Sequence, residues 1–328
     1  MLRFWCTCCV IVVLLASARQ ACAGKVLVIE SYHQGFSWDA SYLRGLREVL
    51  ASDHEIRTFE MDTKRIPAEQ FSRRAAEALA VFREYKPDLV VLGDDNAARL
   101  LAPALLAAAV PIVFLGLNNN PREYSLYGHP HVAGLMERPL LFQSVSVARK
   151  ICPFPIRRVL FLFDVSETSN LIAGDVFHDG ASKELLGIRA DLRQVATVEE
   201  WKDAVQTAGE NGYDLIFVGL SQRLEGAESG CCNDEDMVLW TAQHSPVPSF
   251  GLWDFSIGRG KLAAGLVHVG EEQGRAAGNL ARRLLAGERS VSIPLAVEDG
   301  VLMYSRFEAA RLGLVFPAGL ALNAIAVE

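Results

Sequence analysis

Several polar residues of this sequence could take part in acid–base chemistry, and His33 is the first of them. A histidine beside Asp94 or Asp95 could act as a general base that the carboxylate orients. The chain, however, has no G-x-S-x-G nucleophile elbow, no P-loop, and no G-x-G-x-x-G motif after its first predicted strand. We therefore expect no catalytic residue, and we expect His33 to contact a ligand or to form structural hydrogen bonds. A periplasmic hydrolase that uses His33 is the less favoured alternative.

Polar and aromatic side chains gather at the ends of six predicted strands, three in each half of the chain. In open parallel sheets, ligands bind beyond the carboxyl ends of the strands, so these residues form one candidate site if the two halves face each other. The predicted ligand contacts of the first half are Ser31, Tyr32, His33, Trp38, Asp94, Asp95, Asn96, Asn118 and Asn119. Those of the second half are Asp164, Glu167, Thr168, Ser221, Trp253 and Asp254.

Each of these groups also has a structural explanation. Asp94 to Asn96 and Ser166 to Ser169 could be helix N-caps, which favour these residue types. Asn118 to Asn120 could form a turn, and the aromatic residues could belong to the core. The sequence leaves these alternatives open.

The composition of the predicted site constrains its ligand. Its aromatic side chains, Phe36 and Phe255 included, offer flat apolar surfaces, and its carboxylates offer acceptors for a cation or for hydroxyl groups. No Lys or Arg stands at these six strand ends, so an anionic group would depend on helix N-termini and on Ser and Thr hydroxyls. This pattern suits an amino acid, an aromatic one in particular. A positively charged or neutral polar ligand fits nearly as well.

Alternating strand and helix patterns would position these residues. The predicted strands lie at 25–30, 56–60, 88–93, 110–116, 158–163, 188–194, 214–219 and 248–252, and the predicted helices at 42–51, 68–85, 96–109, 140–151, 169–186, 199–211 and 234–244. Strands that are apolar on both faces and alternate with helices predict parallel sheets covered by helices.

This pattern predicts an α/β protein with two Rossmann-like lobes, each built on a parallel sheet, and a hinge that the chain crosses several times. We expect lobe 1 at residues 24–136 and lobe 2 at 137–255. Part of 256–318 is expected to complete lobe 1, with a strand at 262–267, a helix at 271–286 and a short strand at 295–298. Residues 319–328 are expected to form a C-terminal tail.

The first 23 residues have the features of a signal peptide. Arg3 precedes an apolar run at 10–16, and Ala21-Cys22-Ala23 gives a cleavage pattern. This predicts cleavage near Ala23 and a periplasmic protein. An uncleaved anchor is one alternative, and a lipoprotein attached through Cys22 is another.

Three of the seven cysteines lie beyond this segment, at Cys152, Cys231 and Cys232. Cys231 and Cys232 could form a vicinal disulfide, either could pair with Cys152, or all could be free thiols. No His or second Cys pair stands at ligand spacing, so we expect no metal and no cofactor. A net charge of -7 argues against a nucleic-acid partner. We expect a monomer with a small-molecule ligand.

The segment at 31–38, S-Y-H-Q-G-F-S-W, resembles the S-Y-H-x-G-F-x-W opening of the ABC-transporter substrate-binding-like proteins. These also occur as extracytoplasmic sensor domains of histidine kinases and diguanylate cyclases. Further matches are P-D-L-V before D-D-N at 87–96, P-I-V-F at 111–114, the hinge segment 134–137, W-D at 253–254 and Q-G-R-A-A at 273–277. The resemblance covers almost all of the chain beyond the signal segment. It implies a type I periplasmic-binding-protein fold with a ligand between the lobes, and some family members bind aromatic amino acids.

Two features depart from this family. The stretch 225–233, with its adjacent cysteines, matches no family pattern, and the chain continues only to Glu328, so we expect no kinase or cyclase domain in it. The sequence therefore predicts a periplasmic solute-binding protein that captures a small organic ligand and delivers it to an ABC permease. The alternative is a ligand sensor that docks to a separate membrane histidine kinase or cyclase.

Overall fold

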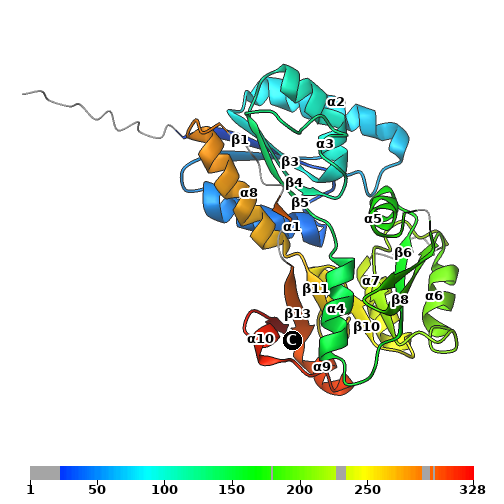
Figure 1. Cartoon of the computed structure of the whole chain (residues 1–328). Helices are drawn as coiled ribbons and strands as arrows, with labels where there is room; N and C mark the ends of the chain where they lie inside the picture. The colour runs from blue at the N-terminus through cyan, green and yellow to red at the C-terminus, as the bar shows by residue number, and fades with distance from the viewer. Residues whose placement is uncertain (1–22, 179, 227–233, 290–295, 298–299) are drawn as a thin grey trace, which may run out of the picture.

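The computed structural model describes residues 23–178, 180–226, 234–289, 296–297 and 300–328. The predicted signal segment before Ala23 and the adjacent cysteines Cys231 and Cys232 lie outside these residues. The described chain folds into two α/β lobes, one above the other in Figure 1. No helix in this part of the chain has both the length and the hydropathy to cross a lipid bilayer.

The first lobe is built on a six-stranded parallel sheet. Its strand order is β12-β5-β4-β3-β1-β2, and the strands are β1 (Lys25–Glu30), β2 (Glu55–Glu60), β3 (Leu89–Gly93), β4 (Ile112–Leu117), β5 (Val132–Met136) and β12 (Ala296–Val297). The helices of this lobe are α1 (Ser37–Leu50), η1 (Ala68–Gln70), α2 (Phe71–Tyr85), α3 (Asp94–Ala107) and α8 (Gly270–Leu285). Helices α2 and α3 cover one face of the sheet and α1 and α8 the other, so the sheet is buried on both sides.

The second lobe has a five-stranded sheet in the order β10-β9-β6-β8-β7. The strands are β6 (Arg158–Asp164), β7 (Ser182–Leu185), β8 (Ile188–Val195), β9 (Leu215–Val218) and β10 (Ser249–Gly251), all parallel except β7. Its helices are α4 (Leu141–Ile151), α5 (Glu167–Phe177), α6 (Val198–Gln206), α7 (Asp234–His244) and η2 (Asp254–Ser256).

One helix prediction in this lobe is wrong. The sequence predicts a helix over 169–186, but α5 ends at Phe177, and residues 182–185 form the edge strand β7, which pairs antiparallel with β8. The two strands are joined at Leu186 and Gly187, which have φ values of 56° and 75°. Two successive residues with positive φ form the tight turn that suits a hairpin. Leucine at the first of these positions is an uncommon choice, which explains why the turn is hard to find in the sequence.

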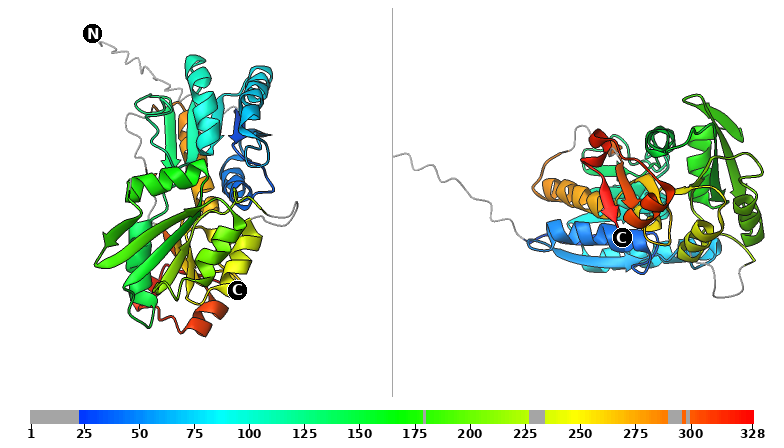
Figure 2. Two further views of the ribbon diagram at one scale, coloured as in Figure 1. Left: turned by 90° about the vertical axis from the view of Figure 1, so that its right-hand side faces the viewer. Right: turned by 90° about the horizontal axis from the view of Figure 1, so that it is seen from below.

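The chain beyond residue 256 contributes to both lobes. Helix α8 and strand β12 belong to the first lobe. Strands β11 (Ala264–Val267), β13 (Val301–Ser305) and β14 (Ile325–Val327) form a separate three-stranded sheet, and α9 (Arg306–Leu312) and α10 (Ala318–Ala321) lie between β13 and β14. This sheet packs against the core of the second lobe, and the helices α9 and α10 lie at the end of that lobe away from the first, as Figures 1 and 2 show. The segment expected as a tail thus contains β14, which pairs with β13.

The positions of the described elements require the chain to pass between the lobes three times, and the third passage includes residues 298 and 299, which the structure does not describe. The chain leaves the first lobe after β5, returns between β11 and α8, and leaves again between β12 and β13. Two parallel-sheet lobes joined in this way are what the sequence predicts, so the predicted fold class is confirmed.

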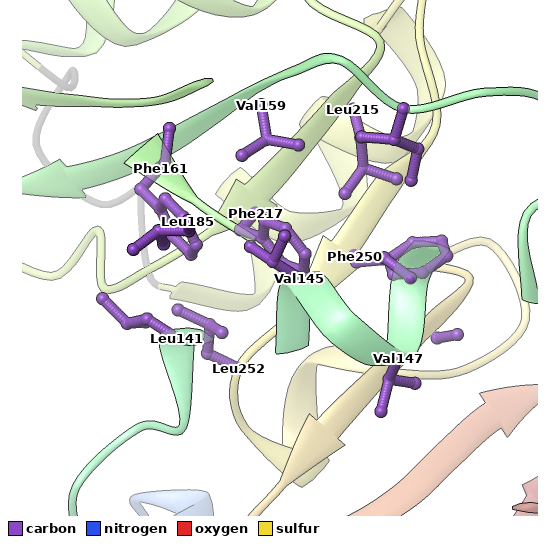
Figure 3. Close-up of a cluster of buried hydrophobic side chains, with 14 of the residues drawn as sticks. Leu141, Val145, Val147, Val159, Phe161, Leu185, Leu215, Phe217, Phe250 and Leu252 are labelled. Carbon is purple, nitrogen blue, oxygen red and sulfur yellow. The ribbon is translucent and has the colours of Figure 1, made fainter. Parts of the chain in front are cut away.

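The core of the second lobe shows why its central strands are continuous apolar runs. Figure 3 shows Phe161 and Phe217 on neighbouring strands, with Val145 and Leu141 of α4 packed over them. The two phenyl rings stack with centroids 4.7 Å apart. Because helices cover both faces of the sheet, residues on both faces of β6 and β9 must be apolar. This core fixes the positions of the strand ends above it.

Helices α1 and α8 pack unusually closely because glycines lie in their contact. A Cβ atom at Gly45 would lie 1.9 Å from the carbonyl oxygen of Glu271, and one at Gly274 would lie 2.0 Å from that of Tyr42. No side chain fits in so short a distance, so the two backbones touch directly. This contact joins the helix that follows β1 to the segment that returns from the second lobe.

A buried carboxylate holds the edge of the second sheet together. Asp191 on β8 accepts hydrogen bonds from Arg158 Nε at 2.8 Å, Arg189 Nε at 2.9 Å, Ser182 Oγ at 2.5 Å and Tyr213 OH at 3.1 Å. Burial would raise the pKa of Asp191, but the hydrogen bonds from Ser182, Arg189 and Arg158 outweigh it and lower the pKa to about 2.

This network gives a prediction for pH-dependent stability. Because the folded-state pKa of Asp191 lies below its unfolded value, its contribution to stability is full above pH 4 and is lost as the pH falls towards 2. Asp191→Asn should therefore lower the free energy of unfolding by on the order of 2 kcal/mol at pH 7 and by clearly less at pH 3. Urea unfolding at the two pH values measures this, and a cost that does not change with pH would contradict it.

The helix contact gives a second prediction. Gly274→Ala would force a methyl group against the backbone of α1, and should destabilise the protein by about 1–3 kcal/mol. Gly174 on α5 is the matched control, since a Cβ there would meet nothing within 4 Å. Gly174→Ala should stabilise by about 0.5–1 kcal/mol, because alanine favours the helix. Thermal unfolding of the two variants should give shifts of opposite sign. Equal shifts would show that the helices separate freely.

Candidate ligand-binding cleft

A small pocket, partly open to solvent, lies where strand ends of the two lobes meet. We call it the interlobe cleft. The side chains that line it are Tyr32, Phe36, Trp38, Lys64, Asp94, Asn118 and Glu137 from the first lobe and its exit, and Thr168, Leu220, Trp253 and Phe255 from the second.

Aromatic rings form a continuous wall across the cleft. Phe36 of the first lobe lies with its centroid 6.0 Å from that of Phe255 of the second, and 5.5 Å from that of Tyr32. Phe255 in turn stacks on Trp253 with a centroid distance of 6.4 Å. Trp253 is anchored by its indole N–H, which donates to Glu137. These rings would offer a flat apolar ligand a surface from both lobes at once.

Lys64 brings a positive charge to the cleft, although no lysine or arginine stands at the six polar strand ends. It follows β2, a strand whose end we did not include among the six polar strand ends. Its ammonium lies 3.8 Å from the ring centroid of Phe36 and 4.1 Å from that of Tyr32, and it donates to the side chain of Gln222 in the second lobe. The cleft therefore contains a positive charge at its aromatic wall.

Asp94 stands at the centre of the cleft in an unusual backbone conformation. It is the first residue of α3 and has a φ of 65°, which residues other than glycine rarely adopt. A Cβ atom at Gly116 would lie 3.2 Å from the Asp94 carboxyl and 3.3 Å from Trp38 Nε1, so the three residues converge. Strained backbone of this kind is concentrated at functional sites.

The acidic groups in and behind the cleft are deeply buried. Burial is the main cause that raises the pKa of Asp94 well above its usual value; Lys64 opposes this shift and Asp95 adds to it. Burial and then Asp94 raise the pKa of Glu137 in the same way. Behind the cleft, burial raises the pKa of Glu30 to about 7. These carboxyl groups retain protons at a pH where exposed carboxyl groups have lost theirs.

Three buried polar atoms of residues that line the cleft have no hydrogen-bond partner within the described residues. They are the acceptors Asp94 Oδ2 and Asn118 Oδ1 and the donor Trp38 Nε1. The indole N–H of Trp38 faces the Asp94 carboxyl and lowers its pKa slightly against burial, but without the geometry of a full hydrogen bond. Buried polar groups are normally paired, so these atoms are available to a ligand or to water.

Of the fifteen residues predicted to contact ligand, six line the cleft: Tyr32, Trp38, Asp94, Asn118, Thr168 and Trp253. The others lie around it, many of them in contacts within the protein. Asp95 accepts from the backbone N–H of Asn118 and of Asn119, and from Tyr124 OH. Asp164 likewise accepts from Ser166 and from the backbone N–H of Arg223. As ligand contacts, these residues stay predictions.

The remaining predicted residues support the same edge. Ser31 Oγ donates to the carbonyl of Gly93, Asn96 donates to Thr63 Oγ1, and Asp254 accepts from the N–H of Gly270. Glu167 lies 3.7 Å from Arg99 across the two lobes, and Ser221 is buried.

Burial and then Arg65 lower the pKa of His33, and Asp62, Glu60 and Lys64 are the other charged groups that act on it. The hydrogen bonds of Asp95 come from Asn118, Asn119 and Tyr124 rather than from His33.

Cys152 forms no disulfide within the described residues, and burial raises the pKa of its thiol to about 12. No cluster of three or more His, Cys, Asp or Glu side chains in this part of the chain is arranged to hold a metal ion. The pairing of Cys231 and Cys232 lies outside the described residues.

A scan against protein-family models gives no match, and a search of curated proteins gives no significant relative. The fold, however, is similar to solved structures. One is an ABC domain from Streptococcus pneumoniae in complex with L-Trp, with a TM-score of 0.65 and 17% identity, which covers 93% of this chain and 100% of that one. Another is the ligand-free, open form of CD0873, a substrate binding protein with adhesive properties from Clostridium difficile, with a TM-score of 0.63 and 15% identity over 93% and 99% of the two chains.

The transcription regulator CcpA of Lactococcus lactis is also similar, with a TM-score of 0.50 and 11% identity over 81% of this chain and 92% of that one. At these identities the likeness shows the fold. The chain has the type I periplasmic-binding-protein fold, and its structural neighbours are ABC-transporter solute-binding proteins and regulators. The neighbours named here are binding proteins and regulators of gene expression.

The buried acids give a prediction for stability. Asp39 on α1 is fully buried, and neither of its carboxyl oxygens has a hydrogen-bond partner in the described chain. Burial, followed by the nearby Asp94 and Glu30, raises the pKa of Asp39 well above its usual value. A raised folded-state pKa means that stability is full at low pH and falls as the pH rises.

Asp39→Asn removes this titration and should make the protein more stable than the wild type at pH 8, with a smaller difference at pH 5. Urea unfolding at both pH values measures the effect. The opposite sign expected for Asp191→Asn provides the internal control. If Asp39→Asn destabilises more at pH 8 than at pH 5, the Asp39 carboxylate has a charged partner.

Proposed function

We propose that this protein is an exported solute-binding protein that closes its two lobes around a small amphipathic ligand, with an aromatic amino acid as the first candidate. The observation that carries the proposal is that one cleft brings together aromatic rings from both lobes and unpartnered polar atoms from the first lobe. The features of the first 23 residues support export to the periplasm. An ABC permease would then be the partner that receives the ligand.

The polar atoms of the cleft suit an ammonium group. Asp94 Oδ2 and Asn118 Oδ1 are both acceptors, and both lie on the wall of the first lobe. A ligand ammonium would donate to them, and its charge would favour the ionised form of Asp94, which burial alone disfavours. The flat part of the ligand would then lie against Phe36, Phe255 and Trp253.

Ligand binding in this cleft would favour the closed arrangement of the lobes. A ligand shifts a conformational equilibrium only through contacts that differ between the two states. In the interlobe cleft these contacts come from both sides, with Asp94 and Asn118 on one and Thr168 and Trp253 on the other. Several polar contacts already span the lobes, such as the hydrogen bond of 3.2 Å from Arg223 Nη2 to the carbonyl of Thr63.

A second candidate function uses the same cleft. A ligand sensor that docks to a separate membrane histidine kinase or cyclase would need the same binding and closure, and would differ only in its partner. The resemblance of the segment 31–38 to extracytoplasmic sensor domains favours this candidate. The L-Trp complex of the S. pneumoniae domain with this fold supports the aromatic amino acid as ligand.

Calorimetric titration with L-tryptophan, L-tyrosine and L-phenylalanine tests the proposal. At least one of them should bind the wild-type protein, and Asp94→Asn should weaken that binding by about 10- to 100-fold, since a hydrogen bond to a charged group contributes about 1.5–3 kcal/mol. Asp203→Asn is the matched control, because Asp203 is an exposed carboxylate on α6 that pairs with Arg193. It should leave the affinity unchanged.

Two results would contradict this account. The absence of both heat and a thermal shift with all three amino acids would remove the aromatic amino acid as ligand. Equal affinities of the wild type and Asp94→Asn would show that the ligand ammonium, if there is one, lies elsewhere.

A further inference from the structure

We propose that Lys64 binds the carboxylate of the ligand, which makes the interlobe cleft selective for zwitterionic aromatic amino acids over the corresponding amines and amides. This inference rests on the proposed function and specifies its ligand class.

The position of Lys64 is the first argument. Its ammonium lies on the wall of the cleft, against the faces of Tyr32 and Phe36, at 4.1 and 3.8 Å from the two ring centroids. Such contacts are favourable for a cation. The lysine side chain is thus directed into the space that a ligand would occupy.

The acceptor that Lys64 now contacts is the second argument. Lys64 donates to the amide oxygen of Gln222, which belongs to the opposite lobe. An ammonium carries three donors, and a hydrogen bond from an ammonium to a carboxylate is about twice as strong as a neutral one. A ligand carboxylate would therefore be a better acceptor than the Gln222 amide. It would take a place beside this amide or displace it.

The charge balance of the cleft is the third argument. Asp94 and Glu137 line the same cavity as Lys64, and Asp39 and Glu30 lie behind it. A simple carboxylic acid would meet these acidic groups, and a simple amine would meet Lys64. A zwitterion places its ammonium at Asp94 and its carboxylate at Lys64, so that each charge has a partner of opposite sign. Because both pairs would lie against buried aromatic and acidic side chains, they would be screened less than pairs in bulk water.

A purely structural role for Lys64 is the alternative to carboxylate binding. This residue is a cation near Asp94 and Asp39, and it connects the two lobes through Gln222. If this were its whole contribution, its removal would weaken the binding of every ligand by the same factor. A role in binding the carboxylate would instead weaken only those ligands that carry one. The two roles are therefore separable by comparing ligands.

The experiment uses the whole protein without its first 23 residues, as export would leave it, and three variants. Lys64→Met keeps the length and apolar stem of the side chain, Lys64→Arg keeps the charge, and Lys25→Met is the matched control. Lys25 also lies over an aromatic ring, at 5.3 Å from the Tyr85 centroid, but outside the cleft. The probes are L-tryptophan, L-tryptophanamide and tryptamine, titrated at pH 6, where all three carry an ammonium.

The wild type and Lys25→Met should bind L-tryptophan about 10- to 100-fold more tightly than the amide and the amine. Lys64→Met should lose most of this preference, with the affinity for L-tryptophan falling by that factor and the other two affinities changing by less than about 3-fold. Lys64→Arg should keep the preference, which guards against a folding defect in the Met variant.

Equal weakening of all three ligands by Lys64→Met would overturn this inference alone and would assign Lys64 a purely structural role. An unchanged preference in Lys64→Met would overturn it as well. If the wild type binds none of the three probes, tryptophan and its analogues are excluded as ligands, and the inference fails together with that form of the proposed function.

Discussion

The interlobe cleft depends on one constraint, which is the direction of the strands. Within each large sheet the strands run parallel, except for β7 at one edge, so their carboxyl ends open on the same side. Helices cover both faces of each sheet, so the polar loops lie at the strand ends rather than on the faces. The chain passes between the lobes at these same ends, and this brings the two polar edges together. Tyr32, Asp94 and Asn118 therefore meet Thr168 and Trp253 although they are far apart in the sequence.

The contacts that fix each lobe internally differ from the contacts that join the two lobes. The glycine contacts between α1 and α8 hold backbone against backbone and fix the helix that carries Trp38 and Asp39. Some of the contacts that span the lobes are polar and partly exposed, such as the pair Arg99 and Glu167. Exposed pairs of this kind contribute little to stability. The proposed ligand-dependent closure requires lobes that are internally firm and contacts between them that can break.

The sequence predicts the fold and part of the cleft for physical reasons. Apolar runs that alternate with helices allow few arrangements other than parallel sheets, and strand ends then follow from strand limits. This reasoning places Tyr32, Trp38 and Asp94 on the cleft wall. It does not distinguish Asp94 from Asp95, because the direction of each carboxyl depends on the positive φ of Asp94.

Lys64 and Glu137 line the cleft but are not predicted from the sequence. Lys64 follows β2, an edge strand whose side chains are only partly buried, so its sequence gives a weaker apolar signal. Glu137 lies in a passage between the lobes, and its role is visible only when Trp253 from the other lobe is placed against it. Long-range contacts of this kind leave no local pattern in the sequence. The edge strand β7 is not predicted because its turn uses leucine where asparagine or glycine is usual.

A crystal structure of the protein purified from its native host, with any small molecule that it retains, tests the central claim most directly. The account predicts electron density for one compact ligand between the rings of Phe36 and Trp253, in contact with side chains of both lobes. Density for a specific ligand outside the interlobe cleft, or against one lobe only, would contradict it.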